Sequence, residues 1–178
     1  MNDSETMSGK KVAVVIPHYG LVGGGEKFAA TLTEHLAKVT ELEFHVLANT
    51  WQAISENVPF HRLPRIHFPR SLRPIGFAWL VQCKLKQLNP DIVHAHERIF
   101  EADVYTAHGI PHELWVRQIR RKTRMSLFDR NLAFVERCMI RNQKLRHILA
   151  VSSIAKHMFT RQFGSLENRL HCVHPGVD

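Results

Sequence analysis

The sequence predicts an α/β protein built on a doubly wound parallel sheet, and three observations support this prediction. Short apolar runs alternate with longer segments in which apolar residues recur every three or four positions. The first run, 12–16, is apolar throughout, as expected of a parallel strand buried on both faces. The chain has 178 residues, with 44% hydrophobic and 22% charged residues, which suits one soluble domain.

The expected elements follow one another as strands and helices along most of the chain. Strands are expected at 12–16, 43–48, 60–63, 91–95, 103–107, 147–151 and 170–173. Helices are expected from Gly25 to Val39, at 75–88 and at 127–139, and a further helix is expected between a cap at Ser152 or Ser153 and Gly164. The proline-containing segment 64–74 is expected to be a loop, and Asn89-Pro90 to end the second helix. Helices between strands make the strands parallel.

A glycine-rich segment joins the first strand to the first helix. Gly23, Gly24 and Gly25 precede the helix, whose free N–H groups and dipole attract anions. The sequence Gly25-Glu26-Lys27 is not the Gly-Lys-Ser/Thr of a Walker loop, and no G-x-G-x-x-G is present. The segment is therefore a candidate site for a phosphate or a sugar phosphate. A simple strand-to-helix turn is the alternative.

Polar residues gather where predicted strands end. In doubly wound sheets, ligands bind at this edge, near the switch in strand order. The candidates are His94, His96, Glu97, Arg98 and His108. His94 and His96 have the spacing of a metal pair on an extended chain, but no partner set is evident, so we interpret them as hydrogen-bonding residues. The edge suits a hydroxyl-rich ligand.

The net charge of +8 is concentrated in one part of the chain. Residues 113–146 contain ten Lys or Arg residues and three acids. The candidates for phosphate or membrane contact are Arg117, Arg120, Arg121, Lys122 and Arg124. Such a segment favours an anionic membrane, a phosphorylated glycolipid or nucleic acid, whereas a solvated helix face is the alternative. No aromatic stacking platform accompanies the arginines, so nucleic acid is not expected.

The remaining composition indicates a cytoplasmic protein. The three cysteines are widely spaced and form neither a disulfide framework nor a CxxC pair. Residues 1–11 are polar and are expected to be a disordered tail without a signal peptide. No run approaches the roughly 18 apolar residues of a membrane-spanning helix, so we expect a soluble protein that can associate peripherally with the inner membrane. Glu26 and Glu34 are expected to be surface or loop-capping acids on the first helix.

Five short motifs together resemble the N-terminal domain of family 4 retaining glycosyltransferases, which have the GT-B fold. They lie at 23–26, 91–96, 106–109, 151–153 and 174–178, in the family's order and strand context. The layout from Glu101 through the basic segment to Arg137 is similar to the lipopolysaccharide core glucosyltransferases. The resemblance implies a Rossmann-like domain over 12–178.

The resemblance also implies roles for individual residues. Gly24, Gly25 and Glu26 would contact the sugar and diphosphate of the donor, and His108 would be the catalytic residue that orients the donor sugar. The acceptor would meet His94, His96, Glu97 and Arg98. The donor would be a nucleotide sugar such as a UDP-sugar, with no metal, and the acceptor a glycolipid or oligosaccharide of the cell envelope. The basic segment would meet lipid or sugar phosphates.

The family's second domain is expected to be missing from this sequence. GT-B enzymes bind the nucleotide mainly with a C-terminal domain, and the sequence stops where the family's interdomain linker begins. We therefore expect an acceptor-side half of a hexosyltransferase, with little transfer activity by itself. A non-catalytic carbohydrate- or anionic-lipid-binding module is the alternative.

Overall fold

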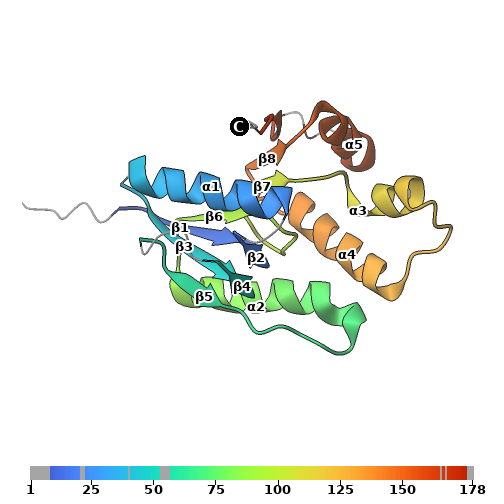
Figure 1. The fold of residues 1–178 in the computed structure, drawn as a ribbon. Coiled ribbons are helices and arrows are strands. Elements are labelled where there is room, and N and C mark those ends of the chain that lie inside the picture. Colours follow the sequence, from blue (N-terminus) through green and yellow to red (C-terminus); the bar gives the residue numbers. More distant parts are fainter. Residues whose placement is uncertain are drawn as a thin grey trace, which may run out of the picture.

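A computed structural model describes residues 9–20, 23–39, 41–52, 57–164, 166 and 168–175. Seven parallel strands form one sheet in the order β5-β3-β1-β6-β7-β8-β9, which confirms the predicted α/β fold (Figure 1). The strands are β1 Lys11–Val15, β3 Glu43–Ala48, β5 Phe60–Arg62, β6 Ile92–Ala95, β7 Val104–Ala107, β8 His147–Ala150 and β9 Leu170–Cys172. A separate parallel pair consists of β2 His18–Tyr19 and β4 Thr50–Trp51. Most of the expected tail, residues 1–8, lies outside the described residues, and Lys11 already belongs to β1.

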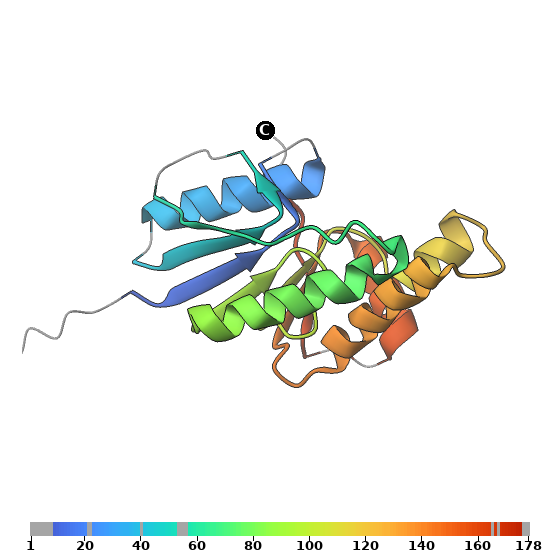
Figure 2. The same ribbon diagram turned by 90° about the horizontal axis from the view of Figure 1, so that it is seen from below.

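Helices cover both faces of the sheet. They are α1 Gly24–Val39, α2 Arg73–Leu88, α3 His112–Leu114, α4 Leu127–Arg141 and α5 Ser153–Phe163, with a 3-10 turn η1 Arg70–Leu72 and a π-helical turn η2 Trp115–Ile119. One apolar cluster joins α1 to β1 and β3, and a larger one joins α2, α4 and α5 to the sheet. Figures 1 and 2 show α1 on one side of the sheet and α2 beside α4 on the other. Burial of these two clusters is the main stabilising contribution to the fold.

The strand order reverses at β1, and this places the candidate residues. β1 pairs with β3 on one side and with β6 on the other, so that Val15 lies between Leu47 and Ala95. β7 continues the sheet beyond β6, with Ala95 opposite Tyr105. The loops after β1, β6 and β7 therefore leave the sheet close together at its carboxyl edge, where ligands bind in this architecture.

Local sequence signals set several helix ends as predicted. The Ser152 hydroxyl accepts a hydrogen bond from the Ala155 amide (3.1 Å) and caps α5, which ends at Gly164 with a φ of 76°. Asn89 ends α2 in the left-handed conformation, with a φ of 46°. Each residue supplies a conformation or a hydrogen-bond acceptor that the terminal turn requires.

The expected loop at 64–74 is shorter in the structure. η1 and the first turn of α2 occupy its last residues, and Pro74 stands in the first turn of α2. Proline is accepted there because its missing N–H would have had no helical partner and its fixed φ suits a helix. The prolines marked a helix start as well as a loop.

Glu34 was expected to be a surface or loop-capping acid, and the structure excludes the surface position. Its residue is only 5% exposed, and the hydroxyl of Tyr19 donates a hydrogen bond to its carboxylate (3.1 Å). Burial, together with the charge of Glu34, raises the pKa of the Tyr19 hydroxyl far above its usual value. The strand β2 carries Tyr19 beneath α1, and the sequence did not reveal this two-residue strand. Glu34 therefore helps attach the loop after β1 to α1.

Candidate functional site

The start of α1 and the end of β7 are in direct contact. A Cβ atom on Gly25 would lie 2.9 Å from Cγ of His108, so the imidazole rests on the backbone of Gly25. Real Cβ atoms do not make contacts this short, so glycine is required for His108 to occupy this position. A Cβ on the neighbouring Gly24 would meet nothing within 4 Å. Gly24 therefore faces open space at the helix N-terminus, while Gly25 accommodates the histidine.

Glu26 closes the glycine loop on the other side. Its carboxylate lies over Gly23, where a Cβ atom would collide with it. The Lys27 amide donates to the Gly23 carbonyl (3.0 Å), which begins the helical hydrogen bonding. A carboxylate in the first turn also complements the helix dipole. This arrangement agrees with the expected loop-capping role.

Three histidines form a row beneath the first turn of α1. The His94 and His96 rings lie on the same side of the chain, with centroids 4.3 Å apart. Nε2 of His94 is 2.8 Å from the Thr106 hydroxyl, and Nδ1 of His96 is 3.0 Å from Nε2 of His108. The Phe28 and His108 rings meet edge to face, with centroids 5.7 Å apart. His94 and His96 are therefore hydrogen-bonded within the protein, as interpreted, and His96 helps to hold the His108 ring in place.

Burial keeps this row uncharged near neutral pH. Desolvation, assisted by His108, lowers the pKa of His94 to about 4. Desolvation also lowers the pKa of His96 well below its usual value, with further contributions from His94 and His108. The pKa of His108 is lowered by burial, although the charge of Glu97 opposes the shift. Neutral imidazoles can donate one hydrogen bond and accept another, so the position of each proton matters.

The unpaired nitrogen of His96 indicates where these protons are. Nε2 of His96 is buried and has no hydrogen-bond partner among the described residues. An unpaired acceptor is tolerated in a protein interior more readily than an unpaired N–H. The proton of His96 therefore belongs on Nδ1, which donates to Nε2 of His108. This leaves the His108 proton on Nδ1. A Cβ atom placed on Gly25 would lie 3.1 Å from this nitrogen.

A cavity of about 480 Å³ opens beside His108. Trp115 and Arg120 stand on one wall, with the guanidinium 5.1 Å from the indole centroid, and the His112 ring stacks on the same indole at 5.6 Å. The described residues that line it are His96, Glu97, Arg98, Tyr105, His108, Gly109, Ile110, His112, Trp115, Arg120, Phe128 and Asp129. Aromatic rings beside hydrogen-bonding groups suit a polar ligand with apolar faces, such as a sugar.

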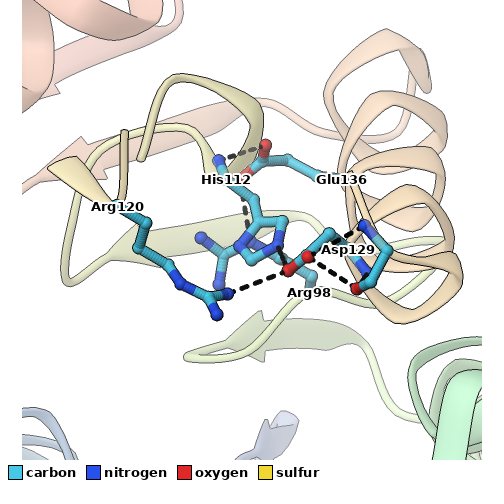
Figure 3. Close-up of polar contacts among 6 residues, drawn as sticks. Arg98, His112, Arg120, Asp129 and Glu136 are labelled. Atoms are coloured by element: carbon cyan, nitrogen blue, oxygen red, sulfur yellow. Dashed lines mark hydrogen bonds and ion pairs between the residues drawn. The ribbon is translucent and has the colours of Figure 1, made fainter. Parts of the chain in front are cut away.

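Two buried carboxylates organise the wall of this cavity (Figure 3). Glu136 accepts from the Arg98 guanidinium (2.8 Å) and from the His112 amide (2.9 Å). Asp129 lies 3.1 Å from the His112 ring and accepts from Arg120 (3.4 Å). Figure 3 shows how these contacts connect the loop after β6 to α3, η2 and α4. Neither acid was expected at the site from the sequence.

Asp129 lines the cavity and also caps α4. It forms a capping box with Ser126, whose hydroxyl donates to its carboxylate (2.6 Å). Although burial raises the pKa of Asp129, hydrogen bonds from Ser126 and His112 outweigh it and the net pKa is lowered. The Ser-x-x-Asp spacing before an apolar run was a sequence signal that could have placed this residue at the start of α4. Nothing in the sequence indicated its contact with His112.

Arg98 and Glu97 lie where the first cavity meets a second one. Arg98 pairs with both Glu136 and Glu97, the latter at 3.2 Å, and its side chain is 18% exposed. The expected acceptor residues are thus divided: Glu97 and Arg98 line both cavities, His96 lines only the larger one, and His94 lines neither. The row of histidines and the cavity wall form one connected site.

The basic segment is only partly paired. Arg117 pairs with Glu113 one turn earlier (3.0 Å), and Arg120 pairs with Asp129. Arg121, Lys122 and Arg124 are exposed and have no ion pair among the described residues. Two apolar side chains, Ile119 at 63% exposure and Leu127 at 67%, flank these cations. The result is an exposed surface, residues 117–127, with both cationic and apolar groups.

Within the described ranges, no group of three or more His, Cys, Asp or Glu residues could hold a metal ion. The helices in those ranges are all too short or too polar to cross a bilayer.

The seven-stranded parallel sheet flanked by helices matches the fold of the N-terminal domain of GT-B glycosyltransferases. The sequence matches the model of Glycosyltransferase Family 4 over residues 22–178, and the chain belongs to this family. The search of curated proteins gave no match. The resemblance noted in the sequence is therefore confirmed for family and fold.

Solved structures share this fold at low sequence identity. WaaG, a glycosyltransferase involved in lipopolysaccharide biosynthesis, aligns with a TM-score of 0.79 and 18% identity, covering 94% of this chain and 45% of WaaG. Sucrose-phosphate synthase from Thermosynechococcus elongatus aligns with a TM-score of 0.66 and 14% identity, covering 95% and 49%. UGT2 from Phytolacca americana, complexed with UDP-2fluoro-glucose and pterostilbene, gives 0.59 and 9%, covering 97% and 55%. The chain spans about half the length of these structures.

The first prediction concerns the tautomer of His108. In ¹⁵N-labelled protein, long-range ¹H–¹⁵N spectra near neutral pH should show His108 protonated on Nδ1. In His96→Phe, which cannot donate to Nε2, this preference should be lost, because isolated imidazole places its proton on either nitrogen. His157→Phe, an exposed position on α5, is the control and should leave His108 unchanged. An Nε2-protonated His108 in the unmodified protein would contradict the assignment.

The second prediction concerns stability in mild acid. Unfolded His94 takes up its proton near pH 6.5, whereas folded His94 does so only near pH 4, so the unfolded state binds more protons between these values. The contribution of His94 to the free energy of unfolding is complete above about pH 6.5. It falls by about 1.4 kcal/mol per pH unit as the pH drops below this value. Urea unfolding as a function of pH should therefore show a shallower slope for His94→Gln.

The exposed His147 supplies the control for this measurement, because its ring lies at the sheet surface. His147→Gln should keep the slope of the unmodified protein. Equal slopes for all three proteins would show that His94 does not resist protonation.

Proposed function

We propose that this domain is the acceptor-side half of a glycosyltransferase that moves a sugar from a nucleotide sugar to a glycolipid or polysaccharide acceptor. The observation that carries the proposal is the contact of His108 with Gly25 at the start of α1. It puts a neutral histidine, free helix N–H groups and a cavity at one edge of the sheet. A sugar diphosphate requires this combination of anion-binding and hydroxyl-binding groups.

The glycine turn would stabilise the leaving diphosphate. As the bond between the donor sugar and the phosphate breaks, negative charge builds up on the nucleotide diphosphate. The N–H groups at the start of α1 are fixed in direction and open at Gly24, so they can bind this charge without rearranging. His108 would donate from Nδ1 to a hydroxyl of the donor sugar and fix the orientation of its ring.

The 480 Å³ cavity would hold the acceptor. Its aromatic wall, Trp115 and His112, offers an apolar face to a sugar ring, and Glu97 offers a hydrogen-bond acceptor to hydroxyl groups. Asp129 and Glu136 are committed to internal partners, so they would position this wall and leave the chemistry to the reacting groups. The nucleotide would be held chiefly by a second domain.

The surface formed by residues 117–127 would face an anionic membrane. Arg121, Lys122 and Arg124 would contact lipid phosphates, and Ile119 and Leu127 would enter the interface between headgroups and acyl chains. This position would bring a membrane-anchored acceptor to the adjacent cavity, whose wall includes Arg120. The similarity in fold to WaaG supports a cell-envelope acceptor of the lipopolysaccharide type.

The third prediction tests the donor site with UDP-glucose. Titration followed by ¹H–¹⁵N NMR should perturb Gly24, Gly25 and the His108 ring, with weak affinity because one domain supplies only part of the contacts. His108→Ala should weaken binding by about two- to tenfold, because it removes one hydrogen bond between neutral groups. A transfer assay with the same chain should show little turnover.

Two results would contradict the proposal. Robust transfer by this chain would show that no second domain is needed. Binding of a glycan or of anionic vesicles without any response to UDP-glucose would favour a non-catalytic binding module. His157→Ala, at an exposed position on α5, is the control for the loss of an imidazole.

A further inference from the structure

A second cavity, of about 220 Å³, lies on the other side of Glu97 and Arg98. The loops after β1, β3, β5 and β6 and the starts of α2 and α4 all contribute to it. The described residues that line it are Pro17, His18, Asn49, Pro64, Arg65, Ile66, Arg70, Arg73, Pro74, Phe77, Glu97, Arg98, Phe128 and Leu132. It therefore opens on the same carboxyl edge as the donor and acceptor sites.

The charge around this cavity is uncompensated. Among the described residues that line it, Glu97 is the only acid, and it already pairs with Arg98, which also pairs with Glu136. Arg65, Arg70 and Arg73 have no ion pair among the described residues. Three cations that surround one cavity without a counter-ion create a strongly positive local potential.

The segment that carries these arginines is held in place. The Arg73 guanidinium donates to the backbone carbonyls of Ile66 (3.0 Å) and His67 (3.1 Å). The Asn131 side chain of α4 donates to the Ser71 carbonyl (2.8 Å), which attaches η1 to α4. These contacts fix the backbone at both ends of the segment 65–73, so its cations are presented at set positions.

One apolar contact and one further hydrogen bond also fix this loop. The Ile66 side chain lies where a Cβ atom on Gly76 would be, so this glycine lets the loop pack on α2. The Asn49 side chain donates to the Leu63 carbonyl (3.0 Å) and anchors the beginning of the loop to the end of β3. A preorganised loop loses little conformational entropy when it binds a ligand.

We propose that this cavity binds an anionic substituent, a phosphate or carboxylate, carried by the acceptor sugar. Arg65 and Arg70 would form the charged hydrogen bonds, since their guanidinium groups are exposed and arginine matches both anions with paired N–H groups. Glu97 and Arg98 line both cavities, so an acceptor ring in the larger one can place a substituent in the smaller. The proposal rests on the proposed transferase function and specifies its substrate class.

The fourth prediction compares three probes by calorimetry and by the arginine Nε–H signals in NMR spectra. Glucose 6-phosphate and glucuronic acid distinguish a phosphate from a carboxylate, and glucose provides the uncharged reference. At least one anionic sugar should bind saturably and at least about tenfold more tightly than glucose, because charged hydrogen bonds are the stronger ones. The Arg65 and Arg70 signals should shift on binding.

Two matched double variants distinguish binding at a specific site from a general effect of positive charge on the affinity. Arg65→Gln/Arg70→Gln should weaken binding of the anionic sugar by at least about tenfold. Lys156→Gln/Arg161→Gln removes the same charge from two exposed positions on α5 and should change binding by less than about twofold. Equal losses in both variants, or no saturable binding of either anionic sugar, would overturn the proposal.

A titration with UDP tests whether Arg65 and Arg70 bind the donor instead. UDP should perturb the glycine turn, and its affinity should be unchanged in Arg65→Gln/Arg70→Gln. If UDP loses affinity with the anionic sugar in this variant, the cavity is a donor site and the inference is wrong. If UDP-glucose still perturbs His108 while the anionic sugars do not bind, the acceptor inference fails and the transferase proposal stands.

Discussion

The contact between the His108 ring and the backbone of Gly25 is the constraint on which the site depends. It joins the first turn of α1 to the end of β7, two elements about eighty residues apart in the sequence that the switch in strand order brings together. The absence of a side chain at Gly25 lets the ring lie against the helix start. The row of histidines below then determines which ring nitrogen carries a proton.

Two electrostatic arrangements meet at this edge. Beneath α1, burial keeps His94 and His96 neutral, and their hydrogen bonds order the ring of His108 without adding charge. Across the cavity, Asp129 and Glu136 are paired with cations and hold α3, η2 and α4 together (Figure 3). The ion pairs inside the wall do not involve the arginines at the second cavity and on residues 117–127 that have no ion pair among the described residues. These arginines can bind anions. Neutral, paired and unpaired ionisable groups therefore occupy different parts of the site.

Much of the fold could be predicted because its signals are local. Apolar runs marked the seven strands of the main sheet, and Ser152, Gly164 and Asn89 marked helix ends. The two-residue strand that carries Tyr19 is too short for any periodicity, which is why the burial of Glu34 was missed. The site was found in part: strand ends indicated His108, but the wall residues depend on contacts between α3, η2 and α4 that no spacing encodes. Arg65 and Arg70 lay in a segment interpreted only as a loop.

The fifth and most direct measurement compares alanine at the two neighbouring glycines. Gly25→Ala should displace the His108 ring, seen as lost contacts between His108 and Phe28 in NMR spectra, and should weaken UDP-glucose binding at least as much as His108→Ala. Gly24→Ala, which adds the same methyl group in open space on the same helical turn, should leave the ring in place. If both variants keep the ring and the affinity, or if Gly24→Ala moves the ring equally, the glycine contact does not organise the site.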